Sequence, residues 1–341
     1  MYSQNNHLNL KLKIWMLSLL LLIIIIILVG GLTRLTDSGL SITTWELFSG
    51  MLPPLSTEKW NDYFNLYKTI PEYNEQNFNM TLKDFKVIFW WEWAHRQLGR
   101  LIGLTVLIPM IYFTINNGFW ILKKYGTIFL LVCIQGFLGW YMVSSGLIER
   151  VDVSHYRLSL HLVTAFIILA IIFWKFLQLI TLQFNHTLIK IYSVKFFLIL
   201  IFVQLIIGAF VSGMDAGKVY NTWPLMGSSY FPDDSNITEF LSISVFDNHS
   251  AVQFIHRNLA YLIVLVYLYI LYFILIEGNK RLIAPFIVIG LSLLLQIVFG
   301  ILTIISGVKM IYASLHQINS ILIILSTLYF LYITQNKKGI N

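Results

Sequence analysis

Four histidines occupy corresponding positions in two similar stretches of this sequence, inside long apolar runs. His95 and His256 each precede an arginine, whereas His161 and His316 each follow a Ser-Leu pair. Ionisable side chains in a membrane span are costly and usually functional. Two histidines that face each other at one level of a helical bundle can hold a porphyrin iron through its two axial positions. The pattern therefore predicts two heme sites, one formed by His95 with His161 and the other by His256 with His316.

Two other interpretations of these histidines stay open at this point. A single histidine in a span often only hydrogen-bonds a neighbouring helix. Zinc is a second alternative, although a structural zinc site normally has four close ligands, and the second half offers no carboxylate or thiolate beside its pair. The single cysteine, Cys133, lies inside an apolar run, so neither an intramolecular disulfide nor a cysteine metal cluster is possible.

A carboxylate distinguishes the two predicted sites. Glu92 precedes His95 by three residues and shares its helix face, whereas Gln253 takes this place before His256. Such a carboxylate can act as a base, a proton acceptor or an iron ligand, which would make the first site the reactive one. The alternative is a hydrated glutamate at the membrane interface.

Three arginines follow the predicted ligands on the same helices, namely Arg96, Arg100 and Arg257. A guanidinium group forms bidentate hydrogen bonds with carboxylates, so these residues are suited to bind heme propionates. The alternative is that they extend from the helix ends toward the aqueous interface.

The elements that position these residues are predicted to be membrane-spanning helices. The chain has 341 residues, of which 57% are hydrophobic and 11% are charged, whereas about a quarter of the residues in a soluble domain are charged. Several apolar runs reach the roughly 20 residues that cross a bilayer as a helix. The eight predicted spans are Trp15–Val29, Trp90–Phe113, Tyr125–Ser145, His155–Leu179, Lys195–Ser212, Val252–Ile276, Ala284–Ser306 and Ile311–Ile333.

The sequence contains an internal duplication. Gly30–Trp45 (GGLTRLTDSGLSITTW) matches Gly208–Trp223 (GAFVSGMDAGKVYNTW), and Gln135–Gly139 matches Gln296–Gly300. Each copy holds four spans, so both copies start on the same side of the membrane. We therefore predict an all-α membrane protein whose eight transmembrane helices form two parallel, pseudo-repeated four-helix bundles.

The duplication also predicts the domain organisation. Residues 1–185 form the N-terminal half and residues 186–341 form the C-terminal half, with one of the two predicted heme sites in each. The outer loop 34–86 of the first half is long and polar. Long loops of this kind often act as lids or binding surfaces.

Basic residues predict the orientation in the membrane. Lysines and arginines of the short loops gather on the side of both termini, which is therefore cytoplasmic. These residues are Lys11, Lys13, Lys123, Lys124, Lys190, Lys280, Arg281, Lys337 and Lys338. The net charge of +7 thus reflects anchoring to membrane lipid, with no sign of a nucleic-acid-binding patch. Each ligand histidine then lies about four to six residues inside the outer end of its helix, or roughly 6 to 9 Å at 1.5 Å per residue.

Several strings, in order along the chain, resemble the heme A synthase family. They are GGLTRLTDSGLS, EWAHRQLGRLIG, QGFLGWYMVSSGL, YRLSLHL, FIHRNLAY and SLHQINS, and the similarity extends from about Gly30 to Asn319. The first outer loop lacks the cysteine pair of one family branch. In this respect the chain looks like the branch found in mitochondria and many proteobacteria.

The resemblance implies an oxidoreductase that converts heme O, its substrate, to heme A. The C8 methyl group of the porphyrin would be oxidised to a formyl group through successive hydroxylations. By the same resemblance, His95 and His161 hold the substrate heme, His256 and His316 hold a resident heme b that passes electrons, and Glu92 takes part in catalysis. The resemblance also implies functional coupling to heme O synthase and to cytochrome oxidase assembly, and a homo-oligomer is compatible with it.

Two other classes of function account for part of the pattern. A diheme b-type membrane electron-transfer protein explains the four histidines but predicts equivalent sites and leaves Glu92 unused. A parallel-repeat transporter explains the duplication, but such carriers place broken helices and polar groups near the midplane, whereas the polar residues here gather toward one face. The lack of an Arg-rich transit segment favours a bacterial inner (cytoplasmic) membrane, with the hemes near its outer face.

Overall fold

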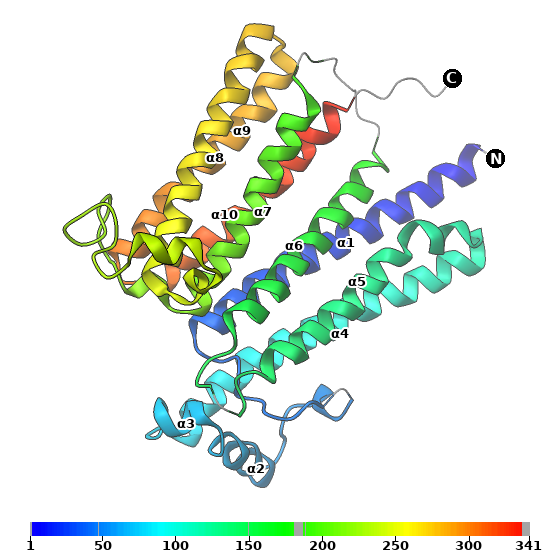
Figure 1. Ribbon diagram of the computed structural model, residues 1–341. Coiled ribbons are helices and arrows are strands. Elements are labelled where there is room, and N and C mark those ends of the chain that lie inside the picture. Colours follow the sequence, from blue (N-terminus) through cyan, green and yellow to red (C-terminus); the bar gives the residue numbers. More distant parts are fainter. Residues whose placement is uncertain (1, 47, 149, 181–186, 188, 336–341) are drawn as a thin grey trace. The chain divides into compact units, whose positions relative to one another are not determined.

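Long helices dominate the structure, a computed structural model that describes residues 2–46, 48–148, 150–180, 187 and 189–335. Eight of these helices are long and apolar enough to cross a membrane, which confirms the predicted all-α membrane fold. They are α1 (Tyr2–Leu35), α4 (Leu82–Asn117), α5 (Trp120–Val143), α6 (His155–Leu177), α7 (Ile191–Gly213), α8 (His249–Glu277), α9 (Lys280–Ile305) and α10 (Met310–Ile333) (Figure 1). A helix suits these apolar runs because it satisfies its backbone hydrogen bonds internally where lipid offers no partner.

The chain divides into two compact units, which are described separately. One unit is Leu17–Leu169, and the other is Ala170–Asn341 together with Met1–Met16. The predicted boundary between residues 185 and 186 falls outside the described residues, as do Lys337 and Lys338. The parallel pseudo-repeat of the two halves stays a prediction.

Helix α4 begins at Leu82, well before the predicted start at Trp90. Thr81 and Asp84 form a reciprocal capping box, in which the Thr81 hydroxyl accepts from the Asp84 N–H and the Asp84 carboxylate accepts from the Thr81 N–H. The prediction that His95 lies only four to six residues inside its helix is therefore wrong. The polar residues between the cap and the apolar run hid this extension.

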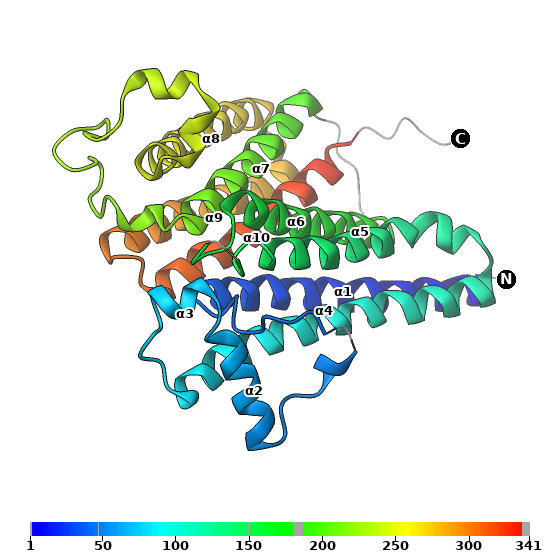
Figure 2. The same cartoon turned by 60° about the horizontal axis from the view of Figure 1, so that its bottom comes forward.

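The outer segment of the first unit is folded over the start of α4. It contains η1 (Ser49–Met51), α2 (Thr57–Tyr67) and α3 (Pro71–Glu75), and Figure 2 shows α2 and α3 beside the first turns of α4. Trp60 packs edge-on against Phe89 with ring centroids 4.9 Å apart, and Phe64 lies 5.0 Å from Phe85. This aromatic core makes the segment a packed cap on the helix bundle.

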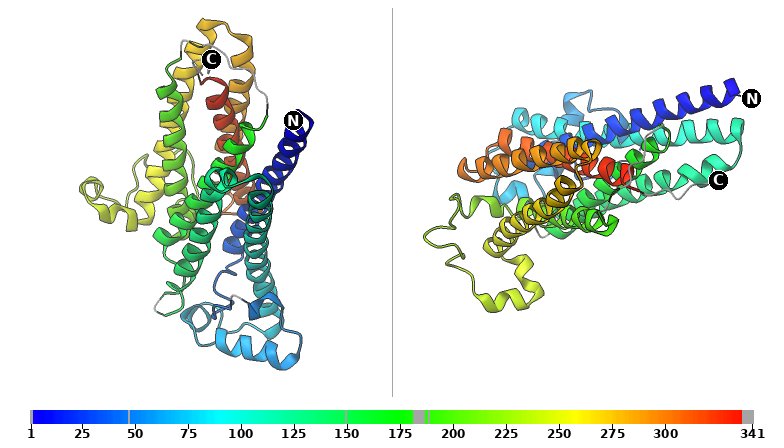
Figure 3. Two further views of the ribbon diagram at one scale, coloured as in Figure 1. Left: turned by 90° about the vertical axis from the view of Figure 1, so that its right-hand side faces the viewer. Right: turned by 90° about the horizontal axis from the view of Figure 1, so that it is seen from above.

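In the second unit, helices α7 to α10 lie side by side (Figure 3). Phe286 on α9 stacks on Tyr267 of α8 at 4.8 Å and contacts Phe330 of α10 at 4.9 Å. The shorter outer segment between α7 and α8 contains η2 (Ala216–Lys218), η3 (Ile237–Leu241) and η4 (Ile243–Asp247). Aromatic side chains thus pack three helices of this unit together.

Helices α1 and α7 are each followed, two residues after their last residue, by an aspartate with left-handed backbone geometry. Asp37 follows α1 with φ of 46°, and Asp215 follows α7 with φ of 53°. Aspartate tolerates this conformation better than most residues with a Cβ. The chain therefore turns sharply back over its own unit at both positions.

Candidate functional site

His256 on α8 and His316 on α10 face each other within the second unit. Their ring centroids lie 6.4 Å apart, and the ring planes are inclined by 66°. An imidazole nitrogen binds a transition metal at about 2 Å, and the ring centroid lies about 1 Å behind it, so two rings on opposite sides of one iron place their centroids about 6 Å apart. The observed spacing therefore fits a single iron between the two rings.

His95 on α4 and His161 on α6 form the corresponding pair in the first unit. The two imidazoles are close enough to interact electrostatically. All four histidines are half-buried in this structure, which contains no membrane. Each unit thus contains one histidine pair contributed by two different helices.

Each of the four histidines packs against a glycine of a neighbouring helix. If a Cβ atom were added to that glycine, it would lie about as close to the ring Cε1 as atoms can approach. The distances are 2.9 Å for Gly30 and His95, 3.1 Å for Gly139 and His161, 3.0 Å for Gly208 and His256, and 3.0 Å for Gly300 and His316. Any larger residue at these four glycine seats would push the imidazole out of place.

Glutamine amides contact two of the rings. The Gln135 amide nitrogen lies 3.2 Å from His161 Nδ1 and donates to the His161 carbonyl at 2.9 Å. Gln204 repeats this arrangement on His256, with distances of 3.2 Å and 3.0 Å. In both cases the amide nitrogen also lies 3.3 Å from Nε2 of the same ring, so the glutamine holds the imidazole in place without selecting one of its nitrogens.

The other two rings differ from each other. His316 Nδ1 lies 3.0 Å from the carbonyl oxygen of Gln296, so its ring is also oriented by a hydrogen bond. His95 Nδ1 is buried and has no hydrogen-bond partner within the described part of the chain. Its ring packs against the Gly30 position of α1.

Glu92 is buried, with 3% of its surface exposed, and both of its carboxylate oxygens accept hydrogen bonds. One carboxylate oxygen accepts from the Ser41 hydroxyl at 2.7 Å and from the Ile42 N–H at 2.8 Å. The other oxygen accepts from Arg96, whose Nη2 lies at 2.6 Å and whose Nε lies at 3.1 Å. The alternative of a hydrated interfacial glutamate is wrong, because Glu92 ties the outer segment to α4.

Gln253 and Arg257 attach the outer segment at the equivalent position of the second unit, where a neutral amide replaces the carboxylate. The Gln253 amide donates to the Tyr220 carbonyl at 3.0 Å. Arg257 donates to the same carbonyl at 3.1 Å and to that of Leu225 at 3.3 Å. At this position the second unit thus holds its outer segment with an amide in place of the carboxylate.

The arginines predicted to bind propionates contact backbone carbonyls of the outer segments. Arg96 donates to Ile42 at 2.7 Å and to Thr44 at 3.0 Å, and Arg100 donates to Glu46 at 2.6 Å. Binding of these arginines to a heme stays a prediction.

A small hollow lies beside Arg96 and Arg100 under the outer segment, and Glu46 and Tyr63 are part of its lining. Burial opposes ionisation of Glu46, but hydrogen bonds from Tyr63, Thr44 and Ser49 outweigh it, so the pKa of Glu46 is lowered. Burial and the bond to Glu46 raise the pKa of Tyr63 to about 12. The hollow therefore presents a carboxylate together with two guanidinium groups.

Glu72 is a second buried carboxylate of the outer segment, and it is 4% exposed. Its oxygen accepts from the Tyr67 hydroxyl at 2.8 Å. Burial raises the pKa of Glu72 to about 8, and the negative charges of Asp152, Asp37 and Glu92 add to this effect, although the Tyr67 bond opposes it. Glu72 is therefore predominantly protonated at neutral pH.

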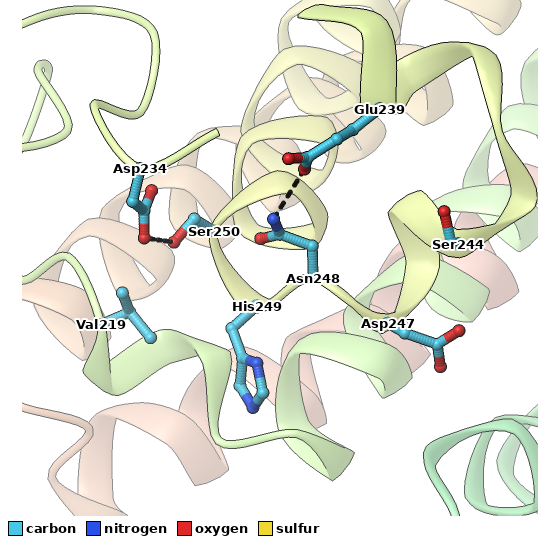
Figure 4. A pocket seen from close by; sticks show the side chains of 8 residues that line it. All are labelled: Val219, Asp234, Glu239, Ser244, Asp247, Asn248, His249 and Ser250. Carbon is cyan, nitrogen blue, oxygen red and sulfur yellow. Dashed lines mark hydrogen bonds between the residues drawn. The ribbon is translucent and has the colours of Figure 1, made fainter. Parts of the chain in front are cut away.

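An open polar hollow lies in the second unit at the start of α8 (Figure 4). Asp234 accepts from Ser250 at 2.7 Å, and Glu239 accepts from Asn248 at 2.8 Å. Among the residues that the structure describes, no group of three or more His, Cys, Asp or Glu side chains is arranged to hold a metal ion.

Eight spanning helices with a histidine pair in each unit define a polytopic membrane protein suited to bind porphyrin iron. A family model described as cytochrome oxidase assembly protein matches residues 13–328. The heme A synthase of Pelagibacter ubique (strain HTCC1062) is 47% identical over 329 residues, covering 96% of this chain and 97% of that protein. The heme A synthase of Rickettsia bellii (strain RML369-C) is 40% identical, covering 91% of this chain and 94% of that protein. The heme A synthase of Maricaulis maris (strain MCS10) is 41% identical, covering 92% of each chain.

The chain therefore belongs to the heme A synthase family, which confirms the resemblance drawn from the sequence. The assignment to the branch without an outer-loop cysteine pair stays a prediction.

Several residues at the sites escaped the sequence interpretation. Gln204 was missed because its counterpart in the first half is Ile26, so a search for matching positions passes over it. Ser41 and Ile42 were missed because they act on Glu92 from a loop. The spacing of a glutamine four residues before a glycine, which recurs on three helices, is the signal that would have found Gln204.

Proposed function

We propose that this chain is a heme A synthase that oxidises the C8 methyl group of heme O to a formyl group through successive hydroxylations. The observation that carries the proposal is the presence of two histidine pairs that differ at one carboxylate, within a chain of this family. A simple electron-transfer protein would have no use for that difference.

In this proposal the two pairs have separate tasks. His95 and His161 bind the iron of the substrate heme O in the first unit. His256 and His316 hold a resident heme b, and their 6.4 Å spacing supports this assignment. When bound, heme b supplies one-electron redox chemistry. Close packing against the four glycines holds the imidazole rings between their helices.

Glu92 has two tasks in the proposal. It fixes the outer segment beside the first site through Ser41 and Ile42, and it accepts protons as the methyl group is oxidised. Arg96 and Arg100 hold the same segment, and their guanidinium groups bind the substrate's propionates.

Arg257 is proposed to serve the resident heme b in the same way. Its Nε is buried and has no partner among the described residues, so it retains a donor that a carboxylate can use.

The protein spans the membrane several times, and its relatives are bacterial. We place it in the bacterial inner membrane with both termini in the cytoplasm and the hemes near the outer face, because the short-loop basic residues lie on the side of the termini. A substrate made by heme O synthase and a product used in cytochrome oxidase assembly would couple this protein functionally to both.

Co-expression with a heme O synthase tests the proposal. Extracted pigment should contain heme A when the chain is intact, and it should contain heme O without heme A when the chain is absent. Heme O as the only product of the intact chain would reject the enzymatic function and favour a diheme electron-transfer protein.

A further inference from the structure

One stretch of the outer segment of the first unit runs along the side of α4. The Thr44 carbonyl accepts from Arg96 at 3.0 Å, and the Glu46 carbonyl accepts from Arg100, one helical turn further on, at 2.6 Å. The chain then turns back, and the Gly50 carbonyl accepts from Gln97 at 2.9 Å. Figure 2 shows η1, which contains Gly50, farther along α4 than α2 is.

This turn reaches the level of the first histidine pair. Gln97 and Arg100 follow His95 by two and five residues along α4. His95 in turn packs against Gly30, which lies five residues before the end of α1 at Leu35. At 1.5 Å per residue, His95 is therefore about 7 to 8 Å inside that helix end. The turn thus lies beside the apolar spans of its unit, and α2 and α3 lie at the start of α4.

The polar groups of the turn are directed toward the protein. The Glu46 carboxylate accepts from the hydroxyl groups of Tyr63 at 2.8 Å, Thr44 at 3.0 Å and Ser49 at 3.1 Å. A Cβ atom on Gly50 would lie 3.2 Å from Arg100 Nη2, so the backbone is pressed closely against α4. Backbone groups at membrane depth need protein partners, because lipid offers none.

The opposite side of the turn is apolar and exposed. Its side chains, which we call the apolar tip, are Phe48 (79% exposed), Met51 (48%), Leu52 (71%) and Leu55 (81%). An exposed apolar patch of this kind marks a surface for a membrane or a protein partner.

The surface of α4 next to the turn favours lipid as that partner. Leu101 and Leu104 follow Gln97 and Arg100 by four residues each, so they share the helix face that carries the turn. They are 47% and 48% exposed, and Ile108, four residues further on, is 61% exposed. Such a stripe on a spanning helix faces acyl chains. The apolar tip continues this stripe.

We propose that the apolar tip is inserted into the nearer leaflet of the bilayer and anchors the outer segment of the first unit there. The turn meets the two requirements for such a place, because its polar groups are bonded on the protein side and its outer side chains are apolar. Insertion would hold the stretch that contacts Glu92, Arg96 and Arg100 against α4. The inference does not depend on the proposed function.

Crosslinking to lipid tests this proposal on the unaltered, heme-loaded protein. The protein is placed in nanodiscs of phosphatidylcholine that carries a diazirine in one acyl chain, and adducts are located by peptide mass spectrometry after illumination. Residues 48–55 should carry lipid adducts, as residues 101–108 should, and residues 73–80 near the start of α4 should carry none. Labelling of 101–108 without labelling of 48–55 overturns the inference.

Cysteine reactivity provides an independent test, in a Cys133→Ser background so that each variant has one thiol. In nanodiscs, Leu52→Cys should react with a water-soluble maleimide at least about 10-fold more slowly than Phe78→Cys, because apolar surroundings disfavour the reactive thiolate. Phe78 belongs to the same outer segment and is 61% exposed. Leu104→Cys serves as the lipid-facing control and should react as slowly as Leu52→Cys. Phe48→Cys repeats the measurement if Leu52→Cys does not fold.

The two measurements together identify what covers the apolar tip. Equal rates for Leu52→Cys and Phe78→Cys would show that the tip faces water and is available to a protein partner, which overturns the inference. Slow reaction without lipid adducts at residues 48–55 would show that a second copy of the chain covers the tip, which overturns it as well.

Discussion

The two units attach their outer segments at equivalent positions with opposite hydrogen-bonding chemistry. In the first unit the Glu92 carboxylate accepts from the Ile42 N–H, whereas in the second unit the Gln253 amide donates to the Tyr220 carbonyl. An arginine one helical turn further on supports each attachment. The two attachments share their geometry, but only the first unit has a carboxylate at this position, and this difference supports the proposal that the first unit carries the chemistry.

The histidine rings show the same contrast between a firmly built site and a looser one. Both rings of the second unit have polar contacts, whereas the buried Nδ1 of His95 in the first unit has no hydrogen-bond partner among the described residues. The predictions below test whether the contrast between the units is functional.

The largest effect is expected from Glu92→Gln. Heme A formation should fall to background while the second unit keeps its heme b, because only the first unit loses its carboxylate. Loss of the charge-assisted bonds should also destabilise the outer segment by about 1 to 3 kcal/mol. Heme extraction measures the first effect, and hydrogen exchange of residues 41–46 measures the second.

Ser41→Ala separates the two tasks of Glu92. It removes one hydrogen bond between the outer segment and Glu92 but keeps the carboxylate and both arginines, so it should retain more heme A formation than Glu92→Gln. Unchanged heme A production in Glu92→Gln would remove Glu92 from the mechanism.

Substitution of a glycine that packs against a histidine ring should give the next largest effect. In Gly139→Ala the new methyl group would lie 3.1 Å from His161 Cε1 and displace the ring, whereas Gly136→Ala on the same helix meets no atom within 4 Å. Heme A formation should fall several-fold in the first variant and stay near normal in the second. Overpacking of this kind typically costs about 1 to 3 kcal/mol. Equal losses in both variants would mean that the seat has no special role.

Glu72 should give the smallest effect, confined to the outer segment of the first unit. Its folded-state pKa of about 8 lies above the ordinary value of 4.5, so the folded segment holds a proton that the unfolded segment loses. The free energy of unfolding of this segment should therefore decrease as the pH rises from about 4.5 to 8, by at most about 1.4 kcal/mol per pH unit.

Glu72→Gln should remove this dependence and stabilise the segment at pH 8. Glu75→Gln alters an exposed glutamate on the same short helix and serves as the control. Limited proteolysis within residues 48–80 across this pH range reports the stability. A pH dependence that persists in Glu72→Gln would show that another group causes it.

Much of the fold could be predicted from the sequence because lipid imposes a simple rule on apolar segments. Each of the eight predicted runs corresponds to a spanning helix. The start of α4 was predicted too late because its first turns are polar and depend on the Thr81 cap and on packing against Trp60 and Phe64. Hydropathy detects burial in lipid and does not detect a helix extended by a capping box.

The histidine positions were predictable from the duplication, but their surroundings were not. Comparing the halves identifies what they share, so it identified His95, His161, His256 and His316. Gln204 has no glutamine counterpart in the first half, and its importance follows only from its contact with the His256 ring. The partners of Glu92 were likewise hidden because Ser41 and Ile42 lie about 50 residues away in sequence.

The central claim is that each unit holds its own porphyrin iron through its own pair of histidines. Optical spectra and heme extraction of the four single histidine-to-alanine variants, co-expressed with a heme O synthase, test this claim most directly. His256→Ala and His316→Ala should lose the retained heme b, whereas His95→Ala and His161→Ala should keep it and make no heme A. Full Soret absorbance in all four variants would contradict the claim. So would loss of heme b from the first-unit variants as well as from the second-unit variants.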